Sequence, residues 1–484
     1  MSATAYTLAS FAPALPEIAL ATLACALLVI DLFLAENEKH VTYWLSLFAL
    51  AGVTAITVMG AGHAPALAFN SMFVSDLMSQ VLKATVLLSV AATLVFSRDY
   101  LQARGLLTGE FLSLALFATL GMMMMVSAHH FITLYIGLEL QALSLYAMVA
   151  LQRDSARATE AAMKYFILGA LSSGLLLYGM SMVYGATGAL ELSAISQAVG
   201  SARVSGTLLV FGLVFVVAGL AFKVGLVPFH MWIPDVYHGA STPATLFIAA
   251  APKIAAFAFT IRVLVTGLHG MTADWSQMLV ILAVGSLALG NVVAIAQTNL
   301  KRMLAYSTIG QMGFMVLGLL SGTVVGYGAS MFYVVTYVLT TLGTFGILMM
   351  ATRAGFEAEE LDDWKGLAKK SPWFAFLMMV LVFSLAGIPP TVGFFAKLSV
   401  LQAALEAGHL WLVVFAVVMS VIGAFYYLRV VKLMYMDEPA GDLALAGRPD
   451  TRLVLSATAF AALVLGILPG PLMDLCATAI KLSM

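Results

Sequence analysis

Residues 219–235 read GLAFKVGLVPFHMWIPD, and they place a lysine and a proline at the end of an apolar run. The run itself is TLLVFGLVFVVAGLAF (207–222), with Lys223 next and Pro228 five residues further on. A lysine costs roughly 2.5–3.5 kcal/mol at the centre of an inserted helix. A proline removes a backbone donor and clashes with the preceding turn. Irregular backbone survives at membrane depth only inside protein or facing water, so this segment predicts an interrupted helix in a hydrated interior.

The rest of the chain has the composition of a membrane protein. Its 484 residues are 62% hydrophobic and only 10% charged, with a mean hydropathy of +1.01. A soluble protein carries about 25% charged residues. Apolar runs of about 20 residues, the length that crosses a bilayer, recur throughout, so we predict an all-α polytopic membrane protein with about fourteen transmembrane helices. The predicted spans are 14–34, 41–60, 72–97, 109–127, 130–151, 160–185, 207–229, 241–267, 275–297, 301–321, 326–351, 373–404, 410–435 and 452–480.

The N-terminus and the cysteines restrict the possible functions. The first basic residue is Lys39, so the chain lacks the basic region of a cleavable signal peptide, and we expect the first apolar run to remain as a helix. Two cysteines, Cys25 and Cys476, cannot ligate an iron–sulfur cluster or form a zinc ribbon. No Gly-rich phosphate loop follows a strand-like run. We therefore expect no cofactor or metal in this chain, and a lipid bilayer rather than nucleic acid around it.

The basic residues predict the orientation of the chain. Loops after odd-numbered spans hold fifteen lysines and arginines, whereas the other face shows three, namely Arg203, Arg262 and Lys481. Loops on the cytoplasmic side carry the excess of such residues. The asymmetry predicts a multi-pass protein of a bacterial inner membrane with both termini on the periplasmic side.

Five lysines that belong to neither set of loops fall inside the predicted spans, and one acid, Glu139, lies near the middle of its span: the lysines are Lys83, Lys164, Lys223, Lys253 and Lys397. Lys83 and Lys164 lie near span ends, where a long side chain can reach the interface, so an interfacial position stays open for these two. The other four are harder to explain in that way. Helix breakers accompany the lysines in spans seven, eight and twelve: Pro228, Pro243, Pro252, Gly387, Pro389 and Pro390.

The order of these features predicts two inverted repeats. Spans four to eight and nine to thirteen each form a block of five with a lysine-bearing, proline-broken helix in fourth place, carrying Lys223 and Lys397 respectively. Because five is odd, the second block begins on the opposite face, as in the inverted repeats of ion-coupled transporters. The predicted divisions are 1–108 (first three helices), 109–267 (first repeat), 275–435 (second repeat) and 436–484 (a loop and the last helix).

The buried charges suggest proton transfer. A desolvated amine can be neutral or cationic near pH 7, whereas arginine effectively never loses its proton. Glu139, Lys223, Lys253 and Lys397, linked by ordered water, are predicted to relay protons through the membrane. Lys164, His230 and His238 are secondary candidates. The alternative is that the charges are structural ion pairs that hold the helices together.

Three segments resemble the antiporter-like membrane subunits of respiratory complex I, and the likeness extends over the whole chain. Mrp-type cation/proton antiporter subunits and membrane-bound hydrogenases share the lysine arrangement. A lysine after PPTVGFFA, here Lys397, is typical of the subunit N family of NADH-quinone oxidoreductase. The related subunit M typically has glutamate there, and subunit L has an extended C-terminal lateral helix. The three segments are GLAFKVGLVPFHMWIPDVYHGASTP (219–243), LKRMLAYSTIGQMGFMVLGL (300–319) and KKSPWFAFLMMVLVFSLAGIPPTVGFFAKLSVL (369–401).

This resemblance implies a proton-translocating subunit of an NADH:quinone oxidoreductase. The family's ion-pair glutamate falls on Glu139, its relay lysines on Lys223, Lys253 and Lys397, and a further family lysine on Lys164. The resemblance also implies that other subunits bind NADH, FMN, iron–sulfur clusters and quinone, with subunit M on one side and subunits K and J on the other. Two alternatives stay open: a subunit of an Mrp-type cation/proton antiporter, and a purely structural membrane-arm subunit.

Overall fold

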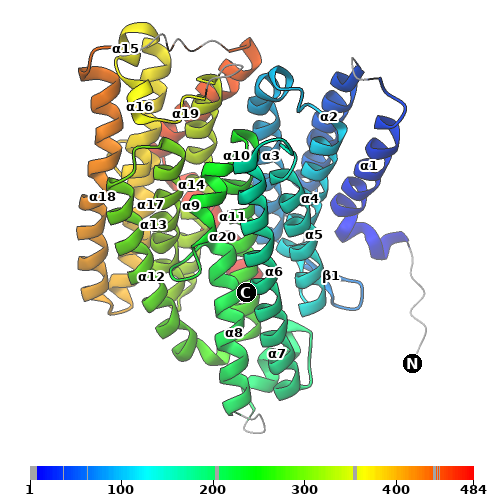
Figure 1. Ribbon diagram of the computed structural model, residues 1–484. Coiled ribbons are helices and arrows are strands. Elements are labelled where there is room, and N and C mark those ends of the chain that lie inside the picture. Colours follow the sequence, from blue (N-terminus) through cyan, green and yellow to red (C-terminus); the bar gives the residue numbers. More distant parts are fainter. Residues whose placement is uncertain are drawn as a thin grey trace.

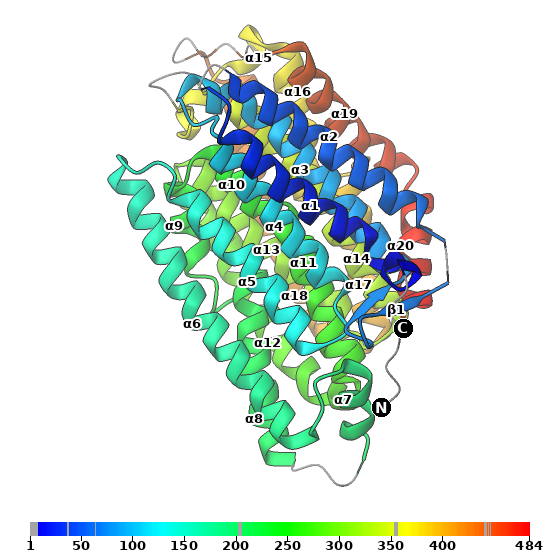
Figure 2. The same ribbon diagram turned by 90° about the vertical axis from the view of Figure 1, so that its right-hand side faces the viewer.

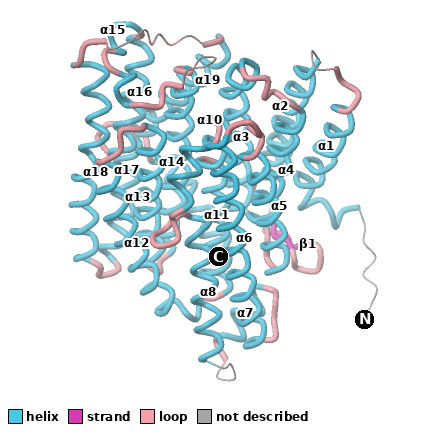
Figure 3. Tube along the Cα trace, in the orientation of Figure 1, coloured by secondary structure: helices cyan, strands magenta, loops and turns pink. Residues whose placement is uncertain are grey.

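The chain folds into a bundle of long helices that run side by side in the computed structural model (Figure 1). The structure describes residues 8–35, 38–62, 64–201, 206–352, 357–439, 443, 445 and 447–484. Within these residues, thirteen helical segments are long and apolar enough to cross a membrane. Figure 3 shows one short antiparallel hairpin among the helices, formed by β1 (Ala66–Ala68) and β2 (Phe73–Ser75). The prediction of an all-α polytopic membrane protein is confirmed.

The helices lie close to the predicted spans. In chain order they are η1 (Leu8–Ala14), α1 (Leu15–Asp31), α2 (Lys39–Met59), α3 (Leu77–Ala103), α4 (Gly109–Ser127), α5 (Phe131–Val149), α6 (Ala156–Thr187), α7 (Leu192–Val199), α8 (Gly206–Val224), α9 (Trp232–Gly239), α10 (Thr242–Ala249), α11 (Ala251–Thr260), η3 (Ile261–Gly267), η4 (His269–Met271), α12 (Thr272–Ile295), α13 (Leu300–Leu320), α14 (Val324–Met350), η5 (Leu361–Trp364), α15 (Leu367–Lys370), α16 (Pro372–Ala386), α17 (Val392–Glu406), α18 (Leu410–Met436), α19 (Pro449–Ile467) and α20 (Gly470–Ser483).

Two consecutive predicted spans are interrupted near their prolines. α8 ends at Val224, and Pro228 lies in the segment before α9. α10 and α11 meet at Ala250, beside Pro252. The sequence predicted a helix break at Pro243, but this proline lies in the first turn of α10. A proline there has no hydrogen bond to remove and starts a helix instead of interrupting it.

The twelfth predicted span, 373–404, consists of two helices. α16 and α17 have 15 residues each, which is too short to cross a bilayer alone. The segment between them, 387–391, contains the predicted breakers Gly387, Pro389 and Pro390. The last predicted span, 452–480, is also divided, into α19 and α20. The chain therefore contains the discontinuous helices that the prolines predicted.

Burial separates a central group of helices from a rim. Nearly all residues of the segment from α10 to η3 are buried, as are most residues of α13 and α14, whereas most residues of α18 are at least partly exposed. The rim exposes large apolar side chains, among them Phe33, Met59 and Met436. An apolar surface of this kind suits lipid or neighbouring membrane subunits. The central helices place their polar side chains inside protein rather than in lipid.

The two predicted five-helix blocks share local features. α4 packs against α5 at the start of the first block, and α12 packs against α13 at the start of the second. The fourth span of each block is discontinuous, as α8 and α9 in the first and as α16 and α17 in the second. The division into two inverted repeats stays a prediction.

The two ends of the bundle carry different elements. Figure 2 shows α15 at one end, and α7, β1 and α20 toward the other. Lys369, which belongs to a loop predicted to be cytoplasmic, lies in α15. Arg203 and Arg353, which also entered the prediction of orientation, lie outside the described residues. The periplasmic position of both termini stays a prediction.

Candidate functional site: buried lysines at broken helices

Lys223 lies in the last turn of α8, directly before the first break. Its amine is 3.4 Å from the Ser173 hydroxyl of α6. Glu139 of α5 acts on this amine through space, and its Oε1 is buried without a hydrogen-bond partner. The predicted glutamate–lysine pair therefore lies within electrostatic range, with α6 packed against both α5 and α8, and no direct hydrogen bond closes it.

Lys253 lies in the first turn of α11 and is only 2% exposed. Its amine donates to the Val224 carbonyl oxygen at 2.9 Å and lies 5.3 Å from the centre of the Trp232 ring. Val224 is the last residue of α8, and the break leaves its carbonyl without a partner inside the helix. Lys253 thus supplies the hydrogen bond that the broken helix lacks.

Lys397 makes the same kind of contact at the other break. It is buried in α17, and its amine donates to the Ala386 carbonyl at 2.9 Å and to Ser420 Oγ at 3.0 Å. Ala386 is the last residue of α16. The amine also lies 4.7 Å from the centre of the Phe314 ring. As at the first break, a lysine caps the C-terminus of the interrupted helix. Lys397 comes from the next helix, α17, whereas Lys253 comes from α11.

A glycine lies next to the capping lysine at each break. Gly225 and Gly387 follow the capped helix ends and have positive φ angles of 94° and 82°. A Cβ on Gly387 would lie 2.8 Å from Lys397 Cδ, and one on Gly225 would lie 3.4 Å from Lys253 Nζ. The sequence analysis paired Lys397 with Lys223, because each lies in the fourth helix of its block. By its contacts, however, Lys397 corresponds to Lys253.

The negative end of each helix dipole faces the lysine that caps it. The C-terminus of a helix carries roughly half a negative charge on its free carbonyls, which favours a cation there. Neither amine reaches a carboxylate among its hydrogen bonds in the described structure. Both cations are therefore stabilised by dipoles and ring faces rather than by opposite charges.

Lys223 and Lys253 line one small cavity, together with Gln141 and Tyr165. The cavity has a volume of about 20 Å³. A space of roughly 10–15 Å³ holds one water molecule if polar groups surround it. The two predicted relay lysines of the first block therefore line one cavity that is large enough for a water molecule.

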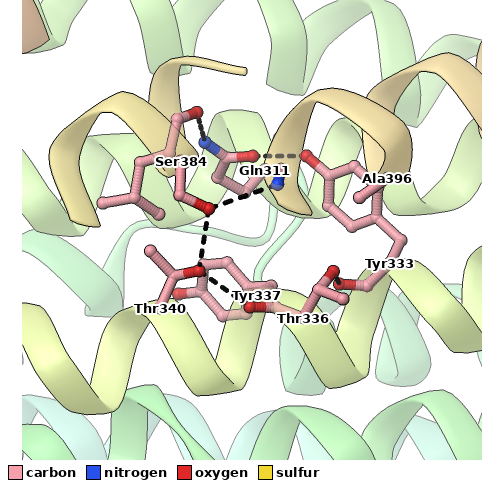
Figure 4. Close-up of a pocket in the computed structure, with 9 residues that line it drawn as sticks. Gln311, Tyr333, Thr336, Tyr337, Thr340, Ser384 and Ala396 are labelled. Carbon is pink, nitrogen blue, oxygen red and sulfur yellow. Dashed lines mark hydrogen bonds between the residues drawn. The ribbon is translucent and has the colours of Figure 1, made fainter. Parts of the chain in front are cut away.

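Several neutral polar side chains lie near Lys397. The sequence analysis did not single them out. Gln311 donates to the Leu385 carbonyl at 2.8 Å and to the Tyr427 hydroxyl at 2.9 Å. It also accepts from the Tyr333 hydroxyl, as Figure 4 shows. These side chains belong to α13, α14 and α18 and lie beside α16. A glutamine in the middle of an apolar span was the available signal, because buried amides are almost always hydrogen-bonded.

The hydroxyl groups in Figure 4 extend this network. Thr340 and Ser384 are 3.2 Å apart, and Ser384 Oγ accepts from the backbone N–H of Gly393. The lining side chains enclose a cavity of about 10 Å³ next to Ala396, the residue before Lys397. The segment between α16 and α17 is therefore held by hydroxyl and amide groups.

Two of the three secondary candidates, Lys164 and His238, lie in a cluster of charged side chains away from the lysine cavity. Lys164 is 42% exposed and lies 2.8 Å from the carboxylates of both Glu160 and Asp235, so it occupies the interfacial position that the sequence left open. His238 is 3.9 Å from the Glu359 carboxylate in the same charge cluster. Neither residue is among those that line the cavity of Lys223 and Lys253.

His230 belongs to the first break itself. Its Nδ1 is buried without a hydrogen-bond partner, in the segment between α8 and α9. The Trp232 indole donates to the Phe222 carbonyl at 3.0 Å and so satisfies a second carbonyl at the end of α8. Of the three secondary candidates, His230 alone lies at the break.

Two deeply buried ion pairs were missed by the sequence analysis. Lys83 lies 2.6 Å from Glu17 and is 1% exposed, so it is paired inside the protein and does not reach the interface. Arg262 of η3 makes two contacts with Asp76, at 2.8 and 2.9 Å. Burial opposes the ionisation of Asp76, but the charge and hydrogen bonds of Arg262 outweigh it and hold the pKa of Asp76 below its ordinary value.

Comparisons with known proteins agree with this architecture. The family described as "NADH:quinone oxidoreductase/Mrp antiporter, TM" matches residues 128–423, more than half of the chain. A chain of the Mrp complex from a Dietzia species has the same fold, with a TM-score of 0.81, 21% identity, and coverage of 98% of this chain and 97% of that one.

Two relatives are similar at the level of sequence. NADH-quinone oxidoreductase subunit N of Thiobacillus denitrificans is 60% identical, and the alignment covers 99% of both chains. A chain of respiratory complex I from Thermus thermophilus is 34% identical with a TM-score of 0.83, covering 96% of this chain and 99% of that one. The broken helices, the buried lysines and these full-length matches lead to one conclusion: the chain belongs to the subunit N family of NADH-quinone oxidoreductase.

Proposed function

We propose that this chain translocates protons as a membrane-arm subunit of NADH:quinone oxidoreductase and that quinone reduction in other subunits drives it. The relay runs from Glu139 through Lys223 and Lys253 to Lys397. Membership of the subunit N family supports the assignment. The burial of Lys253 and Lys397 at helix breaks, away from lipid, supports the route.

The observation that carries the proposal is the bonding of two lysine amines to free helix-end carbonyls. Lys253 bonds to Val224 and Lys397 bonds to Ala386. A cationic amine has three N–H donors, and the neutral amine keeps two, so the carbonyl retains its hydrogen bond in both states. A lysine bound to a carboxylate, such as Lys83, would leave a buried charge unpaired when it lost its proton. The capped lysines are therefore suited to proton exchange.

The open Glu139–Lys223 pair supplies the switch at the start of the relay. An opposite charge within about 4–6 Å favours the charged form of each group, and separation removes that effect. A shift of α5 against α8 therefore changes how readily Lys223 gives up its proton. Conformational change in neighbouring subunits is the proposed source of this shift.

The assembly follows from the same proposal. Subunit M would lie on one side of this chain and subunits K and J on the other. NADH, FMN, iron–sulfur clusters and quinone would be bound elsewhere in the complex. Protons would leave toward the periplasmic side, beyond Lys397, with both chain termini on that side.

Replacing Lys223 by alanine in the assembled complex tests the proposal. We expect Lys223→Ala to reduce proton pumping coupled to NADH oxidation in membrane vesicles, because the switch loses its cation. Lys432→Ala is the matched control, since that lysine is exposed and pairs with Asp437 at the bundle surface. Normal pumping by Lys223→Ala, with the control also normal, would make Lys223 a structural residue and end the relay proposal.

Co-purification separates the proposal from an antiporter of the Mrp type. The complex that contains this chain should bring flavin and iron–sulfur subunits with it. An assembly without these subunits, together with cation-dependent proton exchange, would favour the antiporter function. Unimpaired pumping combined with poor assembly in the lysine variants would favour a structural subunit.

A further inference from the structure

Gln141 has a buried acceptor with no partner in the protein. It lies in α5, two residues after Glu139, and is 8% exposed. Its Oε1 is buried and accepts no hydrogen bond. An unsatisfied buried polar atom costs free energy and calls for an explanation, of which an ordered water molecule is a common one.

The cavity beside Gln141 has the size and the lining that a water molecule needs. Gln141, Lys223 and Lys253 all line the same space of about 20 Å³. A buried water molecule requires roughly 10–15 Å³ and two to four polar partners. Two amine donors and one amide acceptor meet this requirement.

The second break provides a comparison. Gln311 occupies a similar place in α13, the second helix of its predicted block, and it also lies beside a helix break. All of its hydrogen bonds are made within the protein: its Nε2 donates to Leu385 and Tyr427, and its Oε1 accepts from Tyr333. The first block has an orphaned acceptor where the second has an acceptor bound to a tyrosine hydroxyl.

We propose that Gln141 is a positioning residue that holds one water molecule between the Lys223 and Lys253 amines. The proposal deepens the relay proposed above and rests on it. In the bound state the water oxygen accepts an N–H from one amine, and one of its hydrogens is directed at Gln141 Oε1.

The proposed transfer balances in protons and charge. The cationic Lys223 amine gives one proton to the water oxygen, while the water gives one of its own protons to the neutral Lys253 amine. Water is regenerated, and one positive charge has moved between the lysines. The amide oxygen of Gln141 does not take the proton, but it accepts the remaining O–H while charge passes through the water.

The test compares three variants in the assembled complex reconstituted in vesicles. Gln141→Met keeps similar volume and removes the acceptor, Gln141→Asn keeps a neutral amide acceptor, and Ser144→Ala alters a buried residue of the same helix whose hydroxyl donates to the Leu140 carbonyl of that helix. Proton pumping and NADH oxidation are measured together, at equal amounts of assembled complex.

We expect Gln141→Met to pump at least about fivefold more slowly, the effect of losing one hydrogen bond of about 1 kcal/mol. Gln141→Asn should keep more of the rate than Gln141→Met, and Ser144→Ala should match the unaltered chain. A high-resolution map of the assembled complex should show one ordered water bound to Gln141 and both amines, and none in Gln141→Met.

Two results would overturn the inference: a normal pumping rate in Gln141→Met, or equal losses in Gln141→Met and Gln141→Asn. The Lys223→Ala experiment shows whether the relay itself or only the role of Gln141 has failed. If Lys223→Ala stops pumping and Gln141→Met does not, the relay stands and only the positioning of water is wrong. If neither variant affects pumping, the proposed relay itself has failed.

Discussion

At the scale of single residues, the lysines of this chain fall into two chemical classes. Lys83 and Lys164 bind carboxylates, whereas Lys253 and Lys397 bind backbone carbonyls at the ends of broken helices. A carboxylate holds a buried ammonium in its charged form, because separating the pair leaves a charge uncompensated. A carbonyl bonds to the neutral amine as well. The class of the partner therefore indicates which lysines can exchange protons.

Arginine at position 253 separates proton exchange from capping. Lys253→Arg keeps a donor near the Val224 carbonyl, but a guanidinium does not lose its proton in proteins. We expect the complex to assemble and its proton pumping to fall at least roughly a hundredfold, the lower end of the range for loss of a proton-transferring group. The pumping rate of vesicles, normalised to assembled complex, checks this. Full activity in Lys253→Arg would show that capping alone is needed.

At the scale of helices, the two breaks depend on glycine, proline and lysine acting together. Proline ends the regular hydrogen bonding, and glycine adopts a positive φ that other residues adopt at a cost of roughly 1–2 kcal/mol. The lysine then occupies the space that a Cβ would take at Gly387. Each break is thus a built structure with its own capping group.

Replacing the glycines at the two breaks by alanine should destabilise the protein by more than the backbone strain alone accounts for. In Gly225→Ala the new Cβ would lie 2.2 Å from Ile233 Cδ1, and in Gly387→Ala it would lie 2.8 Å from Lys397 Cδ. Gly408→Ala is the matched control, because Gly408 has a φ of 86° but no atom within 4 Å of the new Cβ. We expect lower melting temperatures for the two break variants than for the control. Equal melting temperatures would mean that steric room for the lysine does not matter.

At the scale of the whole molecule, the bundle encloses its charges in helices that lipid does not reach. The buried segment from α10 to η3 carries Lys253, and a rim of apolar helices surrounds it. Arg262 and Asp76 join the far end of this segment to α3 beside the β1–β2 hairpin. The relay helix is therefore anchored at both of its ends, by Lys253 at the break and by Arg262 at the other.

Cysteine labelling tests the predicted orientation. In a background without Cys25 and Cys476, a cysteine at Lys481 in α20 should react with a membrane-impermeant maleimide on intact cells. A cysteine at Lys369 in α15, at the opposite end, should react only after the membrane is opened. The reverse pattern would place the termini in the cytoplasm and contradict the charge asymmetry.

Much of this architecture follows from local sequence signals. The apolar spans and the break at Pro228 could be predicted because hydropathy and proline act through the nearest residues. The partners of the charged groups could not, because they are tertiary. Glu17 lies far from Lys83 in the chain, and Val224 offers Lys253 a backbone atom that no residue type reveals.

Gln141 shows a further limit of the sequence. A glutamine in an apolar span signals a hydrogen bond but not its partner. Only the packing of α5 against the break reveals that the protein leaves its oxygen unsatisfied beside two lysines. Whether water occupies a protein interior depends on the shape of its cavities, and the sequence pattern does not reveal that shape.

The central claim is that the four ionisable groups act as one row that ends at Lys397. The most direct test is the number of protons pumped per electron in Lys397→Met, measured with NADH oxidation in the same vesicles. We predict a lower ratio than in the unaltered complex, because the amine that caps α16 is the last carrier of the relay. An unchanged ratio in a fully assembled Lys397→Met complex would contradict the account.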